Sequence, residues 1–256
     1  MRQLKGTLLN FLIITASVLF LIPALSADTF AVDTCIDCHK DKKFRIQDKK
    51  LFNYYNKWKG SIHDVAGVSC SDCHGGDSTR AKKEKAHPKN LSPTNISSMV
   101  FYKNIPKTCG KCHEKVYKNF IQSKHYKALE KAGKGPNCAT CHGSLVTNVY
   151  YASIVSKTCA SCHNQQTKNH PEIIKTAEQI LQRLNVSRGY LKWASRHFKD
   201  SDKVELLKSI NKLYQNISDS WHQFNFANTD ENSRELLSEL RTIFNETYNK
   251  EKKKKE

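Results

Sequence analysis

Hydrophobic residues recur at helical spacing in the last third of the chain. After Pro171, which suits the first turn of a helix, apolar side chains follow one another three or four positions apart through three stretches. The first stretch contains Ile173, Ala177, Ile180, Leu184, Leu191, Ala194 and Phe198; the second contains Val204, Leu207, Ile210, Leu213, Ile217, Trp221 and Phe224; the third contains Leu236, Leu240, Ile243, Phe244 and Tyr248. Polar residues at 200–202 and 228–230 separate the stretches and predict helix caps. We expect an antiparallel α-helical bundle over residues 171–249 and a charged tail over residues 250–256.

The N-terminal hydrophobic run has a different character. Residues 8–22 are mostly apolar, Arg2 and Lys5 precede them, and Pro23 and small residues follow. This arrangement is typical of an export signal, which we place at residues 1–27. An uncleaved membrane anchor stays open as an alternative, because the run is close to the ~18 residues that span a bilayer. In both cases we expect the rest of the chain in the periplasm or at the extracytoplasmic face of the membrane.

Between these regions, residues 28–170 show no sustained period, and one short motif dominates them. The pattern C-x-x-C-H occurs five times and uses all ten cysteines: Cys35, Cys38 and His39; Cys70, Cys73 and His74; Cys109, Cys112 and His113; Cys138, Cys141 and His142; Cys159, Cys162 and His163. This motif attaches c-type haem, because its two thiols form thioethers to the porphyrin and the adjacent histidine ligates the iron. We therefore predict five covalently bound haem c groups.

Other cysteine chemistry fits this pattern poorly. A zinc ribbon brings two C-x-x-C pairs to one metal and does not require a histidine after every pair. A thioredoxin-like site uses one pair in a βαβ setting, and a disulfide framework would not produce five identical pairs. The fold class we expect is mainly α, with little regular structure around the haems: a multihaem cytochrome c domain over residues 28–170, followed by the bundle.

An internal repeat divides the motif region. Trp58-x-x-Ser61-x-His63 precedes the second motif, and Phe120-x-x-Ser123-x-His125 precedes the fourth. Lys107-Thr108 before the third motif parallels Lys157-Thr158 before the fifth. The region thus reads as two units of haem, Ser-x-His segment and haem, then a single fifth haem. Residues 90–106 contain Pro, Ser, Thr and Asn and predict the loop between the units.

Six histidines remain after the five proximal ligands. His63 and His125 occupy equivalent positions in the repeat, and His87 and His170 each precede a proline shortly after a haem motif. His197 and His222 end successive antiparallel helices, which separates them by roughly 35 Å at about 1.5 Å of rise per residue. We expect His222 to return to the last haem and His197 to face solvent. The predicted distal iron ligands are therefore His63, His87, His125, His170 and His222.

The chain is strongly basic, with a formal net charge of +18. We exclude nucleic acid as a partner, because the lysines are scattered between the motifs and the chain is exported. Excess lysine instead solvates the surface, offsets haem propionates and steers acidic redox partners.

At the motif level the chain resembles the multihaem c-type cytochromes of anaerobic respiration. Ser61-Ile62-His63 before a C-x-x-C-H-G motif, the segment Ile105-Pro106-Lys107-Thr108-Cys109 and the helical C-terminus carry the resemblance. It is closest in style to the pentahaem cytochrome c nitrite reductases and the octahaem hydroxylamine-oxidoreductase relatives. The resemblance implies fold and cofactor. In those nitrite reductases the catalytic haem is ligated by the lysine of a C-x-x-C-K motif, whereas every motif here ends in histidine.

Five distal histidines for five irons favour electron transfer, because two imidazoles saturate each iron. We expect a pentahaem carrier and assign no catalytic residues. Its partners would be redox proteins, namely a quinol-oxidising membrane complex, other cytochromes or a terminal reductase, and the bundle could mediate a homo-oligomer. The alternative is a small multihaem oxidoreductase, of nitrite/hydroxylamine or sulfur-oxyanion type, with one open haem iron.

Overall fold

The computed structural model describes residues 33–145, 151–198 and 203–254. The predicted export signal, residues 1–27, lies outside these ranges. Asp33–Glu256 form one compact unit. All regular structure in the described ranges is helical, with no strand, which confirms the mainly α fold class. None of the described helices is both long enough and apolar enough to span a membrane.

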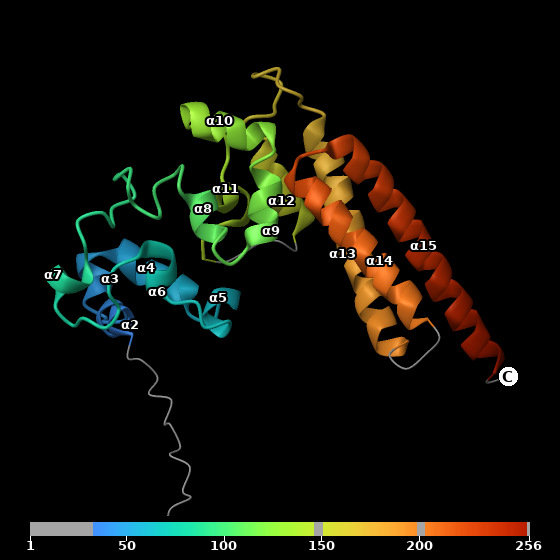
Figure 1. Cartoon of the computed structure of the whole chain (residues 1–256), viewed down its shortest axis with the longest axis horizontal. Coiled ribbons are helices and arrows are strands. Elements are labelled where there is room, and N and C mark those ends of the chain that lie inside the picture. The colour runs from blue at the N-terminus through green and yellow to red at the C-terminus, as the bar shows by residue number, and fades with distance from the viewer. Residues whose placement is uncertain (1–32, 146–150, 199–202, 255–256) are drawn as a thin grey trace, which may run out of the picture. The chain divides into compact units, whose positions relative to one another are not determined.

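Short helices occupy the motif region (Figure 1). They are α2 (Thr34–His39), α3 (Phe44–Gln47), α4 (Lys49–Trp58), α5 (Ile62–Val65), α6 (Cys70–His74), α7 (Lys83–Ala86), α8 (Ile105–Cys109), α9 (Glu114–Phe120), α10 (Lys124–Ala132), α11 (Cys138–His142) and α12 (Ala152–Cys159). The predicted loop over residues 90–106 consists of turns and bends until α8 begins at Ile105. No side chain in residues 33–97 is buried.

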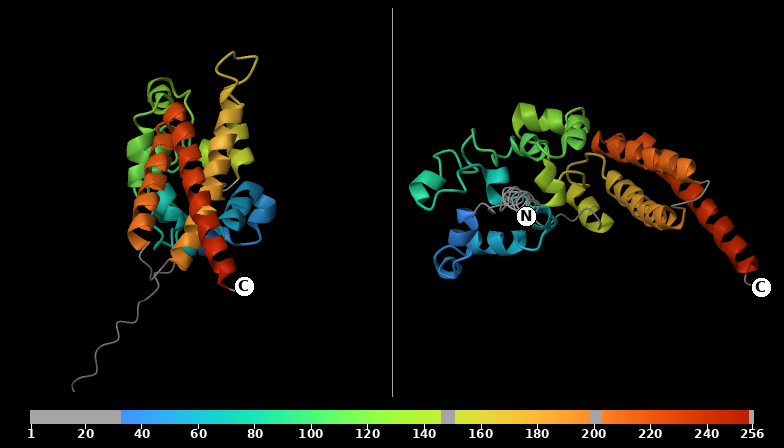
Figure 2. Two further views of the ribbon diagram at one scale, coloured as in Figure 1. Left: turned by 90° about the vertical axis from the view of Figure 1, so that its right-hand side faces the viewer. Right: turned by 60° about the horizontal axis from the view of Figure 1, so that its bottom comes forward.

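Three long helices follow: α13 (Ile173–His197), α14 (Val204–His222) and α15 (Phe226–Lys253). They lie side by side in all three views of Figures 1 and 2. The expected helical bundle is therefore present, with two differences at its ends. Helix α15 begins before the predicted cap at 228–230, because the Asn225 side chain accepts a hydrogen bond from the Asn228 backbone N–H. It also continues through Lys253, beyond the expected end at 249.

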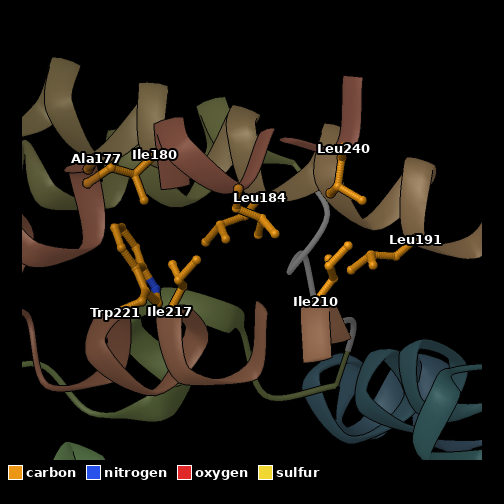
Figure 3. Close-up of a cluster of buried hydrophobic side chains, with 9 residues drawn as sticks. Ala177, Ile180, Leu184, Leu191, Ile210, Ile217, Trp221 and Leu240 are labelled. Carbon is orange, nitrogen blue, oxygen red and sulfur yellow. The ribbon is translucent and has the colours of Figure 1, made fainter. Parts of the chain in front are cut away.

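The bundle has a continuous apolar core (Figure 3). Its buried members are Ala177, Ile180, Leu184, Leu191, Ile210, Ile217, Trp221, Leu236 and Leu240. They recur at the three- and four-residue spacing that places side chains on one face of a helix. An ion pair joins the outer helices of the core, since Arg183 on α13 donates to Asp230 and to Ser233 on α15.

The bundle is anchored to the motif region at the end of α14. Lys115 on α9 forms an ion pair with Asp219 at 2.8 Å, and the Gln223 side chain donates to Asn119 at 2.8 Å. The ring of Phe224 packs edge-on against Phe120. The α12 helix packs on α13, and Cys159 at its end contacts the bundle core. The last motif is therefore attached directly to the bundle.

Candidate functional site

The five motifs take two local forms. The first, second and fourth motifs lie inside the helices α2, α6 and α11, each of which ends at the motif histidine. The third and fifth motifs begin at the last residue of the helix that precedes them, Cys109 of α8 and Cys159 of α12. In these two motifs the cysteine carbonyl accepts the histidine backbone N–H, at 2.9 Å for His113 and 2.8 Å for His163. Both forms place the two thiols and the histidine on about one helical turn, as one porphyrin requires.

A glycine ends the motif helix in the second and fourth motifs. Gly75 has a φ of 76° and Gly143 a φ of 75°, a backbone conformation that residues with a Cβ rarely adopt. A Cβ on Gly75 would also come within 3.3 Å of Met99 Sδ. The final glycine of C-x-x-C-H-G therefore turns the chain away directly behind the histidine.

Consecutive motifs are neighbours in space. The pKa of Cys35 is raised to about 12, first by burial, then by Asp33 and also by the thiol of Cys70. Burial and then the thiol of Cys109 raise the pKa of Cys73, and burial and then the thiol of Cys159 raise the pKa of Cys141. The pKa of Cys109 is raised first by its hydrogen bond with Cys138. The five sites thus form one series in which each motif adjoins the next.

Four motif histidines face a second histidine. The ring centroids are 6.0 Å apart for His39 and His87, and 6.4 Å apart for His63 and His113. They are 5.9 Å apart for His125 and His163, and 6.3 Å apart for His142 and His222. Each pair joins one proximal ligand to one of the predicted distal ligands.

These separations match the coordination of a metal by two imidazoles. A histidine nitrogen binds a metal at about 2 Å, so two rings on opposite sides of one ion have centroids roughly 6 Å apart. Ring pairs that no metal joins cover the same range, such as Phe244 and Tyr248 at 6.3 Å, so the four pairs are distinguished by the fact that each joins a motif histidine to a second histidine. The four pairs therefore fit haem iron held between them.

The Ser-x-His segments have a structural cause. Ser61 and Ser123 are the N-caps of α5 and α10, where their hydroxyls accept the backbone N–H groups of Asp64 and Tyr126. Each cap starts a helix whose second residue is the distal histidine. His63 faces the third motif and His125 the fifth, so each Ser-x-His histidine passes over the next motif and serves the one after it.

Backbone carbonyls orient two of the imidazoles. His163 Nδ1 lies 2.7 Å from the Asn169 carbonyl, and His222 Nδ1 lies 2.7 Å from the Ser218 carbonyl. Because a carbonyl only accepts, Nδ1 carries the proton in both rings and Nε2 keeps the lone pair that a metal needs. By contrast, Nδ1 of His125 and of His142 is buried with no hydrogen-bond partner among the described residues. Among the described residues no carbonyl therefore fixes the tautomer of those two rings.

Burial lowers the pKa of five of the candidate ligands. It is the main cause that lowers the pKa of His39, His74, His125, His142 and His222. The largest effect is at His142, whose pKa falls to about 4 through burial and then through the neighbouring charges of His222 and His113. A metal-binding histidine must be deprotonated, so this environment suits iron ligation.

Three histidines stand outside the pairs. His74, the proximal ligand of the second motif, has no histidine ring against it anywhere in the described part of the chain. His170, a predicted distal ligand, is exposed and lies 3.1 Å from Glu172. His197 stacks on Trp193 and forms an ion pair with Glu251. His222 lies against the fourth motif rather than the last one, where we expected it.

One contact of the site could not be predicted from its residue type. The Phe224 ring lies edge-on to His125, with centroids 4.1 Å apart, and in sequence it reads as one more apolar position of the bundle. Its positive φ of 58° turns the chain after α14 and directs this ring at the motif region. The one sequence signal for this contact is that Phe224 comes at the end of the predicted apolar face of its helix.

Comparisons with known proteins agree with this geometry. Residues 52–132 match the cytochrome c552 family. The chain is also 27% identical over 132 residues to the multiheme cytochrome MtrA of Shewanella baltica (strain OS185), a match that covers 52% of this chain. It covers 32% of that relative, so the chain spans about a third of its length. No solved structure matches. The two matches support a multihaem c-type cytochrome.

Proposed function

We propose that this multihaem c-type cytochrome is an exported electron carrier of anaerobic respiration that holds five haems c in one series. Bound haem supplies one-electron redox chemistry at potentials set by its axial ligands. The observation that supports the proposal best is the set of four histidine pairs with centroids 5.9–6.4 Å apart. Their side chains come from separate helices and loops, so the two histidines of each pair would hold a haem iron between them.

The polypeptide contributes more than ligands. The adjacent cysteine pairs bring consecutive sites together, and backbone carbonyls hold His163 and His222 in one tautomer. Two such imidazoles would leave a bound haem iron with no position for a substrate, which favours electron transfer. In this proposal residues 28–170 form the haem-binding domain, and residues 171–249 form the supporting bundle. The partners are redox proteins in the periplasm or at the extracytoplasmic face of the membrane.

A catalytic role remains the second candidate, because His74 has no paired histidine in the described ranges. An oxidoreductase acting on nitrite, hydroxylamine or a sulfur oxyanion would need one such iron.

The test begins with the exported holoprotein. Its intact mass should exceed that of the processed polypeptide by five haems, and a reductive titration should be reversible over all of them. A lower haem count, or bound zinc, would contradict the proposal.

A matched pair of variants then tests the axial ligands. His222→Ala should convert one low-spin ferric haem to high spin, because it removes the ring that faces His142. His197→Ala is the control, since His197 contacts Trp193 and Glu251 instead. Electron paramagnetic resonance measures the result. An unchanged spectrum for His222→Ala together with a new high-spin signal for His197→Ala would refute the assignment.

A further inference from the structure

His74 lies in a setting that differs from those of the other four motif histidines. It is exposed, and no second histidine ring lies against it in the described ranges. It belongs to a complete C-x-x-C-H-G motif with the same helix and terminal glycine as the fourth motif. The two sites therefore differ in what faces the histidine and not in how the motif is built.

The internal repeat explains the difference. The second motif is the counterpart of the fourth, since each follows a Ser-x-His segment whose histidine passes on to a later motif. The fourth motif receives its second histidine from the bundle, where His222 ends α14. No bundle follows the first unit, and the loop histidine that does follow it, His87, faces back to His39 of the first motif. The first unit thus has no histidine left for His74.

The two uncommitted histidines do not fill the gap. His170 is exposed beside Glu172, and His197 lies at the far end of α13 against Trp193 and Glu251. The remaining candidate near this motif is Met99, whose sulfur approaches Gly75 and lies 3.5 Å from Lys111 Nζ. Met99 thus lies beside Gly75, the residue that directly follows His74.

We infer that the haem held by Cys70, Cys73 and His74 is the ligand-binding haem of the protein. Its iron takes a small exogenous ligand of a few atoms, of the kind that binds directly to haem iron, such as carbon monoxide or nitric oxide in the ferrous state and cyanide in the ferric state. The other four irons are closed by His87, His63, His222 and His125. This inference rests on the proposed function, because it requires the five haems.

Carbon monoxide is the probe. The fully loaded, reduced holoprotein should bind about one carbon monoxide per protein, because ferrous haem takes this ligand only at an available sixth position. The ferric form should show one high-spin haem. Each of His87→Ala, His63→Ala, His222→Ala and His125→Ala should raise the count to about two. Four such increments would show that those irons are closed in the unmodified protein and would leave the iron of His74 as the open one.

Two further variants separate the competing ligands. His170→Ala and Met99→Leu should both leave the count at about one. If the unmodified protein bound no carbon monoxide, the inference would be wrong. A rise to one in His170→Ala or in Met99→Leu would then identify the residue that closes the iron, and no rise in either would leave Lys111, which lies beside Met99, or a second copy as the source of the ligand. Haem content and reversible reduction are measured on the same samples, so failure of the proposed function is seen separately.

Discussion

The first unit of the motif region and the C-terminal bundle differ in how much apolar surface the polypeptide itself buries. In residues 33–97 no side chain is buried, and apolar residues such as Ile46 and Val65 are 90% and 81% exposed. In the bundle, Ile180 and Leu236 are fully buried within a core of nine residues. The bundle therefore supplies its own apolar interior. The first unit has helices but no buried side chains of its own. Porphyrins attached at its C-x-x-C-H motifs would supply the missing apolar interior.

The largest difference between the two regions is expected when haem cannot be attached. A variant with serine at all ten cysteines should lose protection from hydrogen exchange over residues 33–97, where opening would cost close to zero free energy. The bundle should keep slow exchange in α13 and α15, because its core consists of protein side chains alone. Hydrogen-exchange mass spectrometry measures both regions in one sample. Protection of α4 and α6 in the variant would show that the first unit folds without haem.

Two alanine substitutions, one in each region, compare the stability that a buried and an exposed apolar side chain contribute. Leu236→Ala should lower the free energy of unfolding of the bundle by about 2–5 kcal/mol, through lost burial and the cavity left behind. Ile46→Ala should change the stability of the bundle by less than about 0.5 kcal/mol, because this side chain is exposed and lies outside the bundle core. Chemical denaturation of the holoprotein, followed by far-ultraviolet circular dichroism, measures the difference. Equal losses for the two variants would contradict the contrast between the regions.

The smallest expected effect concerns the ion pair between α13 and α15. Asp230→Asn should cost about 1–2 kcal/mol of bundle stability, because it weakens charged hydrogen bonds from Arg183 and Arg234. Burial alone would raise the pKa of Asp230, but the two arginines outweigh it and hold the pKa below its ordinary value of 3.8. The contribution of Asp230 is therefore present above that value and is lost as pH falls through the folded pKa.

Acid denaturation tests this sign. The advantage of the unmodified protein over Asp230→Asn should be constant at neutral pH and should shrink below about pH 4. Arg241→Gln is a suitable control, since that arginine lies on the same helix and forms none of the ion pairs of Asp230. An advantage that persisted under strong acid would exclude this electrostatic origin.

Much of the fold was predictable because its signals are local. Apolar residues that recur every 3.6 positions predict a helix that buries one face. The three bundle helices could therefore be placed from the apolar positions that include Ile173, Ile217 and Leu240. The ends of α15 were wrong, since they depend on whether Asn225 or a later residue caps the helix. The motif cysteines and proximal histidines are set by a spacing of five residues, which also needs no knowledge of the fold.

The distal histidines are a different matter, because they belong to contacts between distant segments. The expected antiparallel return of α14 predicted that His222 and His197 have different surroundings, as they do. It did not predict which motif His222 lies against. That depends on how α14 docks through Asp219 and Gln223, whose partners Lys115 and Asn119 lie on α9. Counting ligands also assumed that every histidine near a motif is used. The prediction that His170 is a distal ligand is untested, and the inference drawn for His74 argues against it, because His170 is exposed and lies beside Glu172.

The reach of each Ser-x-His histidine to the motif after next has a consequence for how such chains grow. Neither unit is self-contained, because His63 of the first unit completes a site that belongs to the second. Inserting another copy of the unit would lengthen the series, because the Ser-x-His histidine of each copy lies against the first motif of the next, but it would also add a second motif without a paired histidine, like that of His74. In the last copy the counterpart of His74 is His142, and α14 places His222 against it. The bundle thus stands to the haem units as a terminal cap stands to a solenoid of repeats.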